Sequence, residues 1–546
     1  MKKYTWIYKA VLLLTVLCLM FTTLGGCSEK AGSTTKESPD KGQATQTGGS
    51  ANTITSKPIT LSYWAVFSGL AKETIPDLSK NEVYMELEKR TNVKLNFIHP
   101  AQGQEAEQFN LMIASGDIPD IIEQAERYKG GIDKAISDGI YIKLNDFVDK
   151  HAPNFKKVIN SNENLKKQVY SDNGNLLGFG MITSDLPGSS TEQPSVENPY
   201  AGPFLRNDWL KELNMKVPTT IDEWYAVLKA FKDVKKAEVP FLWDKSGIQD
   251  RTGAFLSAYG IGPAFFIKDG QIKYGPIEPG FKQYLELLNK WYKEGLIDKD
   301  FPTRDAKSAE ALYMSGKVGA TLNDSTALCL KTRAVGIDFV GAPYPKINAN
   351  TDIHWRYLNN ICRDYYGVVT SKNKYPVESV KWFDYHYSAE GFKLFNFGVE
   401  GKSYTKINDK GRPEYVDYIA KNNYQDFDRF NMVFRLHNGP YLKSDGRSNP
   451  RRWMEDLESY RITWDKQPSD YVMPPVTLTE KEGKEYATIM SDIDSYKAEM
   501  VIKFIIGQEP LSKFDEFADK IKKMNIQKSI ELQKTALDRY NKRVPK

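Results

Sequence analysis

The side chains best suited to chemistry in this 546-residue chain are flat aromatic rings and planar polar groups. Tryptophan offers a large, rigid contact surface at low entropic cost, and arginine donates paired hydrogen bonds from a flat fork. The stretch Trp355-Arg356-Tyr357 places both types side by side. Six tryptophans lie outside the N-terminal segment and outside amphipathic helical patterns: Trp64, Trp209, Trp243, Trp355, Trp453 and Trp464. This chemistry is binding by stacking and hydrogen bonding.

Signatures of catalysis or of a resident metal are missing from the sequence. It contains no nucleophile elbow, phosphate loop or His-Glu-x-x-His motif. Its 70 acidic residues make pairs of carboxylates too common to indicate a glycosidase, and its five histidines are scattered. Asp172-Asn173-Gly174-Asn175 lacks the alternating ligands and distal Glu of an EF-hand loop, and Asn-Gly fits a hairpin turn. We therefore expect no enzyme, no cofactor and no resident metal.

The first 27 residues have the parts of a secretory signal. Three lysines precede an apolar run, residues 10–21, which is shorter than the roughly 20 residues that cross a bilayer. Leu24-Gly25-Gly26-Cys27 resembles the bacterial lipobox, in which Cys27 becomes the lipid-carrying N-terminus. We expect residues 1–26 to be the signal peptide and 27–57, rich in Ser, Thr and Gly, to be a lipidated flexible tether. An uncleaved membrane anchor is the alternative, and either places the protein on the extracellular face of the cell membrane.

Charge and cysteine content limit the classes of partner. Three of the positive charges behind the formal net charge of +5 lie in the signal, so the remainder carries about +2. That is too small a bias to indicate nucleic acid as a partner. Apart from Cys18 and Cys27, the chain has only Cys329 and Cys362. In an exported protein these two could form a disulfide or remain buried thiols, and the sequence leaves both possibilities open.

Hydrophobic periodicity predicts strands and helices in alternation. Residues 59–63, 93–97 and 121–122 are typical of strands, while 79–90 and 109–116 are typical of helices, the first with a capping box at Ser79 to Glu82. This order is typical of a parallel sheet covered by helices.

The pattern continues further along the chain. Residues 220–231 form an amphipathic helix opened by a capping box, residues 281–295 a second helix, and residues 318–322 a strand. The last 60 or so residues are typical of helices. The fold class predicted from these elements is α/β.

Several stretches resemble the extracellular solute-binding protein family of ABC importers, in its carbohydrate-binding branch. They are Leu111–Asp120 (LMIASGDIPD), Leu144–Asp146 with His151–Asn154, Asn175–Phe179, Leu205–Leu210 with Val217–Thr220, Ser315–Ala320 and Phe397–Tyr404. The stretches follow one another between residues 59 and 546. The branch that they resemble comprises large lipoproteins of Gram-positive bacteria that serve oligosaccharide uptake.

The resemblance implies a type II periplasmic-binding fold, with two α/β lobes joined by hinge strands and a ligand cleft between them. One lobe would comprise residues 58–178 plus about 369–470, and the other about 179–368 plus about 471–546. The implied function is to bind an oligosaccharide and deliver it to ABC permease subunits in the membrane. We expect the protein to act as a monomer.

Ten residues are candidates for ligand contact: Trp64, Asp117, Arg206, Trp209, Trp243, Asp324, Trp355, Arg356, Tyr357 and Glu400. Trp64 ends the first strand, at the sheet edge where ligands bind in α/β folds. Arg206 could donate its fork to hydroxyls or to a uronate. Asp324 could face the cleft, as in relatives, or cap the following helix. For the others, core packing or turn formation is an open alternative.

Three other functions remain open beside oligosaccharide transport. A peptide could be the ligand instead of a sugar, although an aromatic content of 12% mildly favours sugar. The same cleft could serve a co-receptor for a sensor kinase. A surface carbohydrate-active enzyme is the remaining alternative.

Overall fold

The computed structural model describes residues 53–67, 69–183, 201–243, 253–358, 360–417, 427–436, 438–444, 450, 459–460, 463–464 and 466–543. The predicted signal, Cys27 and Trp453 lie outside these residues. Residues 51–546 form one unit, and all contacts below are within it.

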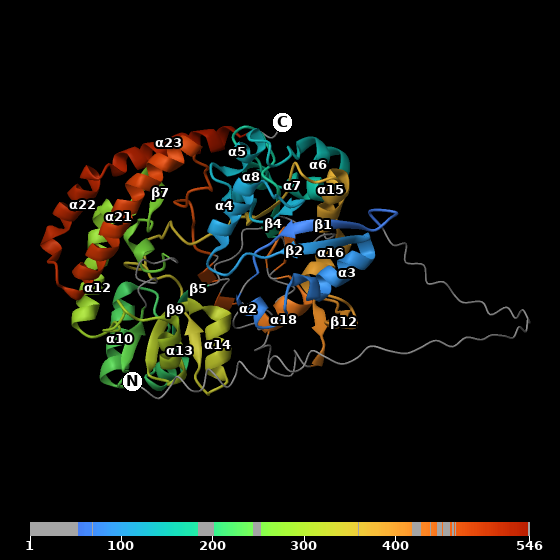
Figure 1. Cartoon of the computed structure of the whole chain (residues 1–546). Coiled ribbons are helices and arrows are strands. Elements are labelled where there is room, and N and C mark those ends of the chain that lie inside the picture. The colour runs from blue at the N-terminus through green and yellow to red at the C-terminus, as the bar shows by residue number, and fades with distance from the viewer. Residues whose placement is uncertain are drawn as a thin grey trace, which may run out of the picture. The chain divides into compact units, whose positions relative to one another are not determined.

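The first of two main sheets holds six strands in the order β14-β4-β11-β3-β1-β2. Its strands β1, β2 and β4 are labelled in Figure 1. Its strands are β1 (Ile59–Trp64), β2 (Val93–Ile98), β3 (Ile121–Ile122), β4 (Phe179–Thr183), β11 (Cys362–Val369) and β14 (Leu442–Lys443). Strand β1 runs parallel to β2 and β3. Strand β11 is antiparallel to β3 and β4, and β14 is parallel to β4.

The strands and helices predicted for residues 59–122 are confirmed. In β1, alternate residues Leu61 and Tyr63 are fully buried, as a strand covered on its inner face requires. Helix α4 (Glu105–Ser115) ends at Gly116, whose φ of +74° suits glycine. The predicted capping box at Ser79 is wrong: the side chain of Asn81 caps α3 (Glu82–Thr91), because residues 78–80 form a separate 3-10 turn.

Further helices and one hairpin surround the first sheet. They are α2 (Gly69–Lys72), η1 (Leu78–Lys80), η2 (Ala125–Arg127), α5 (Gly131–Ser137), α6 (Asn145–His151), α7 (Pro153–Ile159), α8 (Glu163–Val169), α15 (Pro376–Tyr385), α16 (Ala389–Phe397), α18 (Phe427–Phe434) and the pair β12 (Tyr404–Ile407) and β13 (Pro413–Tyr415). The Asn-Gly turn at residues 172–175 joins a short antiparallel bridge, Tyr170 to Leu176, as predicted for a hairpin turn.

The second sheet has the order β10-β5-β9-β6. Its strands are β5 (Ala201–Arg206), β6 (Val239–Leu242), β9 (Val318–Asp324) and β10 (Phe339–Gly341). The associated elements are α9 (Asn207–Glu212), α10 (Ile221–Asp233), η3 (Leu256–Tyr259), β7 (Phe265–Lys268), β8 (Gln271–Tyr274), η4 (Gly275–Ile277), α12 (Pro279–Lys293), α13 (Ala306–Met314) and α14 (Ser325–Arg333). The predicted capping box of Thr220 and Glu223 is confirmed at the start of α10.

The C-terminal part is helical, as predicted. It contains α21 (Glu480–Ile506), η6 (Leu511–Lys513), α22 (Phe514–Lys523) and α23 (Ile526–Lys542). The inner faces of α21 and α22 pack into the same core as the second sheet.

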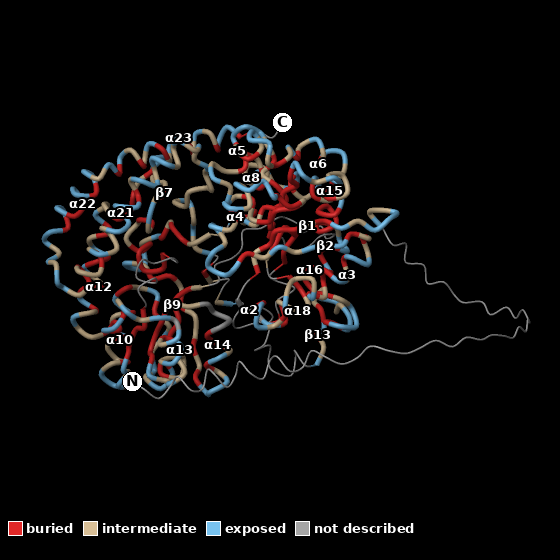
Figure 2. Tube along the Cα trace, viewed as in Figure 1, coloured by how far each residue is buried: buried red, intermediate tan, exposed pale blue. Residues whose placement is uncertain are grey.

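Each sheet has its own hydrophobic core, visible as two buried regions in Figure 2. The first core draws on residues 61–182 and 361–442, and the second on residues 204–355 and 464–526. Strands β4 and β11, which the sequence placed at the lobe boundaries, both belong to the first sheet. The predicted residue limits of the two lobes stay a prediction.

The end of α23 reaches back to residues around the first core. Arg539 and Arg543 both donate to Asp172, at 2.7 and 2.6 Å, and Arg543 also donates to the carbonyl of Lys167. The turn that carries Asp172 is held by Asp133, which accepts from Ser171, Asn173 and Asn175. Two cations from the C-terminal end of the chain thus converge on the carboxylate of Asp172.

Cys329 and Cys362 are free and buried, so the structure has thiols rather than a disulfide at these positions. No helix among the described residues is long and apolar enough to cross a membrane. The described part of the chain contains no group of three or more His, Cys, Asp or Glu side chains placed to hold a metal ion.

Candidate functional site

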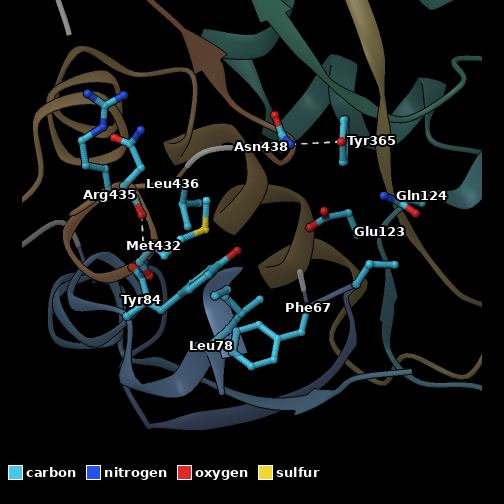
Figure 3. Close-up of a pocket in the computed structure, with 14 residues that line it drawn as sticks. Phe67, Leu78, Tyr84, Glu123, Gln124, Tyr365, Met432, Arg435, Leu436 and Asn438 are labelled. Atoms are coloured by element: carbon cyan, nitrogen blue, oxygen red, sulfur yellow. Dashed lines mark hydrogen bonds between the residues drawn. The ribbon is translucent and has the colours of Figure 1, made fainter. Parts of the chain in front are cut away.

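A cavity of about 140 Å³ lies at the carboxyl ends of β1 and β3 (Figure 3). Phe67 follows β1 by three residues, and Glu123 follows β3 directly. The adjoining walls come from β11 and from residues 431–438 in and after α18. Because parallel strands end at the same edge, this edge is where α/β sheets bind ligands.

One wall of the cavity is aromatic and apolar. Phe67 and Tyr84 line it, and both side chains are largely buried. Phe67 stacks on His99 with ring centroids 4.8 Å apart, and Tyr84 meets Phe97 edge-on at 4.9 Å. Figure 3 shows both rings beside the side chain of Leu78. These contacts fix the rings, so they offer rigid faces to a ligand.

Glu123 provides a buried carboxyl group in the polar part of the cavity. It is 6% exposed, and its Oε2 accepts a 2.7 Å hydrogen bond from the Tyr63 hydroxyl. Burial raises the pKa of Glu123 to about 8, while the Tyr63 hydrogen bond acts in the opposite direction. At neutral pH the group is therefore mostly protonated, and a protonated carboxyl both donates and accepts hydrogen bonds.

Amide side chains form another part of the polar lining, which also includes Arg435. Asn431 is 4% exposed, and among the described residues its Oδ1 has no hydrogen-bond partner. Asn438 donates to the Tyr365 hydroxyl at 3.0 Å. Asn81 donates to the carbonyls of Met432 and Arg435, both at 2.9 Å, and so joins α3 to α18.

The arrangement combines rigid ring faces with hydrogen-bonding groups. Such a lining suits a ligand with apolar C–H faces and several hydroxyl groups. The C–H faces can pack on the aromatic rings, and the hydroxyl groups can hydrogen-bond with the polar side chains. An unpartnered amide oxygen such as that of Asn431 is costly to bury, and a ligand hydroxyl could satisfy it.

Three predicted contact residues lie near the first core but do not line this cavity. Trp64 is 3% exposed and packs edge-on against Phe109, with ring centroids 6.1 Å apart. Asp117 is exposed, and its backbone N–H donates to Ser115 in a turn. Glu400 is exposed beside the β12–β13 hairpin. Ligand contact by these residues stays a prediction.

Three others belong to the second core. The Arg206 guanidinium forms a bidentate pair with Asp208, donates to the Gly316 carbonyl at 2.7 Å, and lies 4.1 Å from the Trp209 ring. Trp209 itself is 8% exposed, and Trp243 is fully inside the core. The structure thus gives all three a packing role, and their contact with ligand stays a prediction.

The remaining four are also associated with the second sheet. Trp355 and Arg356 are largely buried, and Arg356 donates to the Gln467 carbonyl at 2.8 Å. Tyr357 is partly buried against the second core. Asp324 ends β9, with its side chain outside the described part of the structure. The cavity beside Glu123 is not lined by Trp355, Arg356 or Tyr357.

Reasoning from the sequence missed the polar residues that do line the cavity. Glu123 had a usable signal, because it follows the strand Ile121-Ile122 directly, as Trp64 ends the first strand. No sequence signal pointed to Tyr365, Asn431 or Asn438, because these residues reach the cavity from segments more than 200 residues after Glu123.

Comparison with known proteins gives one family and several relatives. The family model described as bacterial extracellular solute-binding protein matches residues 69–391. The fructooligosaccharide ABC transporter substrate-binding protein FusA of Streptococcus pneumoniae serotype 4 is 23% identical over 485 residues, covering 85% of this chain and 88% of FusA. The polygalacturonan/rhamnogalacturonan-binding protein YtcQ of Bacillus subtilis is 24% identical over 463 residues, covering 81% and 85%.

Solved structures are similar over nearly the whole chain. The alginate-binding protein AlgQ2, determined without calcium ion, superposes with a TM-score of 0.68 at 25% identity, covering 89% of this chain and 99% of AlgQ2. FusA in complex with kestose superposes with a TM-score of 0.70 at 21% identity, covering 88% of this chain and 99% of FusA.

Proposed function

The chain belongs to the bacterial extracellular solute-binding protein family, and on that basis we propose that it binds an oligosaccharide for an ABC importer. The predicted type II periplasmic-binding fold, with two α/β lobes and a ligand cleft between them, is confirmed by the similarity to the solved structures. FusA is named for fructooligosaccharide, YtcQ for polygalacturonan and rhamnogalacturonan, and AlgQ2 for alginate. All three names specify carbohydrate.

One observation carries the proposal for this chain: the composition of the cavity at the ends of β1 and β3. Phe67 and Tyr84 supply ring faces, and Glu123, Asn431 and Asn438 supply hydrogen-bonding groups. Pyranose and furanose rings have the same division into C–H faces and hydroxyl edges. A ligand held there would satisfy the buried oxygen of Asn431.

The mechanism that we propose needs a ligand that contacts both lobes. The cavity is lined by residues 66–84, 123–124, 365 and 431–438, from the segments around the first sheet, so the ligand must extend from it to the second lobe. Ligand contacts with both lobes stabilise a closed arrangement over an open one, and the difference in binding free energy supplies the closure. The closed form would then be recognised by ABC permease subunits, with the receptor acting as a monomer. Binding without chemical conversion is sufficient for this role, so we propose no enzymatic activity.

The location that we propose rests on the sequence. Family membership makes the protein extracellular. Cleavage before Cys27 and lipidation of its thiol would hold it to the outer face of the cell membrane, with residues 27–57 as the tether.

A thermal-shift screen tests the proposal. The chain from residue 27 onward, with C27S to prevent lipidation, would be mixed with kestose, oligogalacturonates, alginate oligosaccharides and short peptides. A ligand that binds only the folded state raises the melting temperature. A rise with one oligosaccharide class supports the proposal and identifies the cargo, whereas a rise with peptides alone contradicts it. Release of shorter sugars during incubation would instead indicate an enzyme.

A sensor co-receptor would bind the same ligand but a different partner. Pull-down of the ligand-bound protein with detergent-solubilised membranes separates the two roles, because a permease and a sensor kinase are distinguished by mass spectrometry.

A further inference from the structure

Strand β11 contains a backbone irregularity beside the cavity. It pairs with β4 at Cys362 and Arg363 and again at Gly367, with a shift of register between Arg363 and Gly367. Within this bulge Tyr365 has a φ of +74°, the left-handed region. A bulky side chain rarely adopts that conformation, which is strained and persists only where neighbours enforce it.

The side chain of Glu126 holds the bulge. Its Oε1 accepts from the N–H of Tyr365 and its Oε2 from the N–H of Tyr366, both at 3.2 Å. Glu126 lies in η2, three residues after Glu123. One carboxylate therefore binds two consecutive peptide groups of β11, and both of its oxygens are used.

The bulge determines where the Tyr365 ring lies. The ring lines the cavity, and its hydroxyl accepts from Asn438 at 3.0 Å (Figure 3). Three residues later β11 is regular again, because Val368 and Val369 pair with Ile122 and Ile121 of β3. Without the bulge, the period-two alternation of a strand would place the residue-365 side chain differently relative to its neighbours.

We propose that Glu126 is a positioning residue for ligand binding, which holds the β11 bulge and thereby keeps the Tyr365 ring in the wall of the cavity. Tyr365 contacts the ligand, and Glu126 acts through it. The inference rests on the proposed function insofar as the cavity takes an oligosaccharide, but the link between Glu126 and the bulge is independent of the ligand.

A double-mutant cycle tests the link. The variants are E126Q, Y365G and the two combined, in the full chain with C27S, with affinity measured for kestose, an oligogalacturonate and an alginate oligosaccharide. Glutamine keeps the shape but only one acceptor oxygen, so E126Q is expected to weaken binding about tenfold. Glycine adopts positive φ without strain and has no ring to position. In the Y365G background E126Q is therefore expected to change affinity less than twofold.

A purely structural role for Glu126 predicts a different result. It would weaken binding by the same factor in both backgrounds, and such additivity would overturn the proposal. If Y365G does not fold, Y365N replaces it, because asparagine tolerates the left-handed region. D384N is the matched control: Asp384 also accepts from a backbone N–H, that of Phe155 at 2.8 Å, but does not line the cavity. It is expected to leave affinity unchanged.

Hydrogen–deuterium exchange gives a measurement that needs no ligand. E126Q is expected to accelerate exchange in the peptide covering residues 362–369 at least fivefold, with little change in β1. If no sugar binds the wild type, the proposed function fails while this measurement still decides whether Glu126 holds the bulge. Unchanged exchange in β11 would contradict the proposal whatever the affinity results.

Discussion

Tyr63 and Glu123 form a 2.7 Å hydrogen bond between a phenol and a carboxyl group, although the two side chains are 0% and 6% exposed. Tyr63 lies in β1 and Glu123 directly follows β3, the adjacent parallel strand, so the contact lies at the edge of the sheet next to the cavity. A carboxyl in such surroundings is stabilised in its neutral form. Its protonation state therefore links the stability of the fold to pH.

Replacing Glu123 with glutamine should remove this link. The folded-state pKa is raised from 4.5 to about 8, so between these pH values the folded protein binds more protons than the unfolded chain. The free energy of unfolding must then fall as pH rises from 4.5 to 8, by at most about 4–5 kcal/mol. In E123Q this slope should be absent. Urea unfolding of both proteins at pH 5 and pH 8 checks this, and parallel pH profiles would contradict it.

His386 should make the protein sensitive to acid. Its Nδ1 donates to the Pro440 carbonyl at 2.8 Å, and complete burial lowers its pKa to about 3. Between pH 3 and 6.5 His386 is protonated in the unfolded chain but not in the folded protein. The free energy of unfolding therefore falls as pH decreases, by about 3 kcal/mol at pH 4. Asparagine keeps a donor for the carbonyl, and H386N should therefore show a shallower loss between pH 6.5 and 4. An unchanged slope would assign the acid sensitivity to other groups.

Substitution of Asp172 should release the end of the C-terminal helix. D172N leaves Arg543, whose side chain is 3% exposed, without its carboxylate, and we expect a loss of about 2–3 kcal/mol in the free energy of unfolding. The exposed pair Lys534 and Asp538 on the same helix is the control. D538N should have no measurable effect, because exposed ion pairs contribute little. Equal effects of the two variants would argue against the role given to Asp172.

Substitution of Arg206 distinguishes a packing role of this side chain from a ligand-binding role. R206K keeps the charge but loses the fork that joins Asp208 and the Gly316 carbonyl. We expect a loss of stability of about 2 kcal/mol, with affinity for the ligand found in the thermal-shift screen changed less than twofold. A tenfold loss of affinity at unchanged stability would instead confirm the prediction made from the sequence.

Cys27 should determine where the protein is found. In a Gram-positive host, C27A is expected to move most of the protein from the membrane fraction to the medium, because no lipid can be attached. Metabolic labelling with a palmitate analogue provides the direct measurement. Retention of C27A at the membrane without label would favour the uncleaved anchor.

Local sequence patterns were sufficient for most elements near the N-terminus of the folded part. Alternation in β1 and β2, the apolar pair of β3 and the glycine after α4 each specify a backbone conformation within a few residues. The start of α3 was misplaced because Ser79 and Asn81 are both good caps, and only the geometry of the preceding turn selects Asn81.

The site was harder to predict because a tryptophan side chain can either stack on a ligand or pack in the core. Trp64 and Trp243 are candidates from the sequence for stacking on a ligand, and in the structure each is at most 3% exposed. A side chain with so much apolar surface is stabilised most by complete burial. The aromatic rings that line the cavity are those of Phe67, Tyr84 and Tyr365, and their convergence depends on tertiary structure.

The topology of the first sheet also fixes an order of events during synthesis and export. Strand β3 pairs with β11, nearly 250 residues later, and β4 pairs with β14, some 260 residues later. When the N-terminal end of the chain is exported first, β3 and β4 therefore stay unpaired with β11 and β14 until most of the chain has crossed the membrane. Pairings between segments so distant in sequence also form slowly. During that interval the apolar edges of β3 and β4 are open to aggregation. Folding helpers outside the membrane would thus be needed most while residues 184–442 are still being delivered.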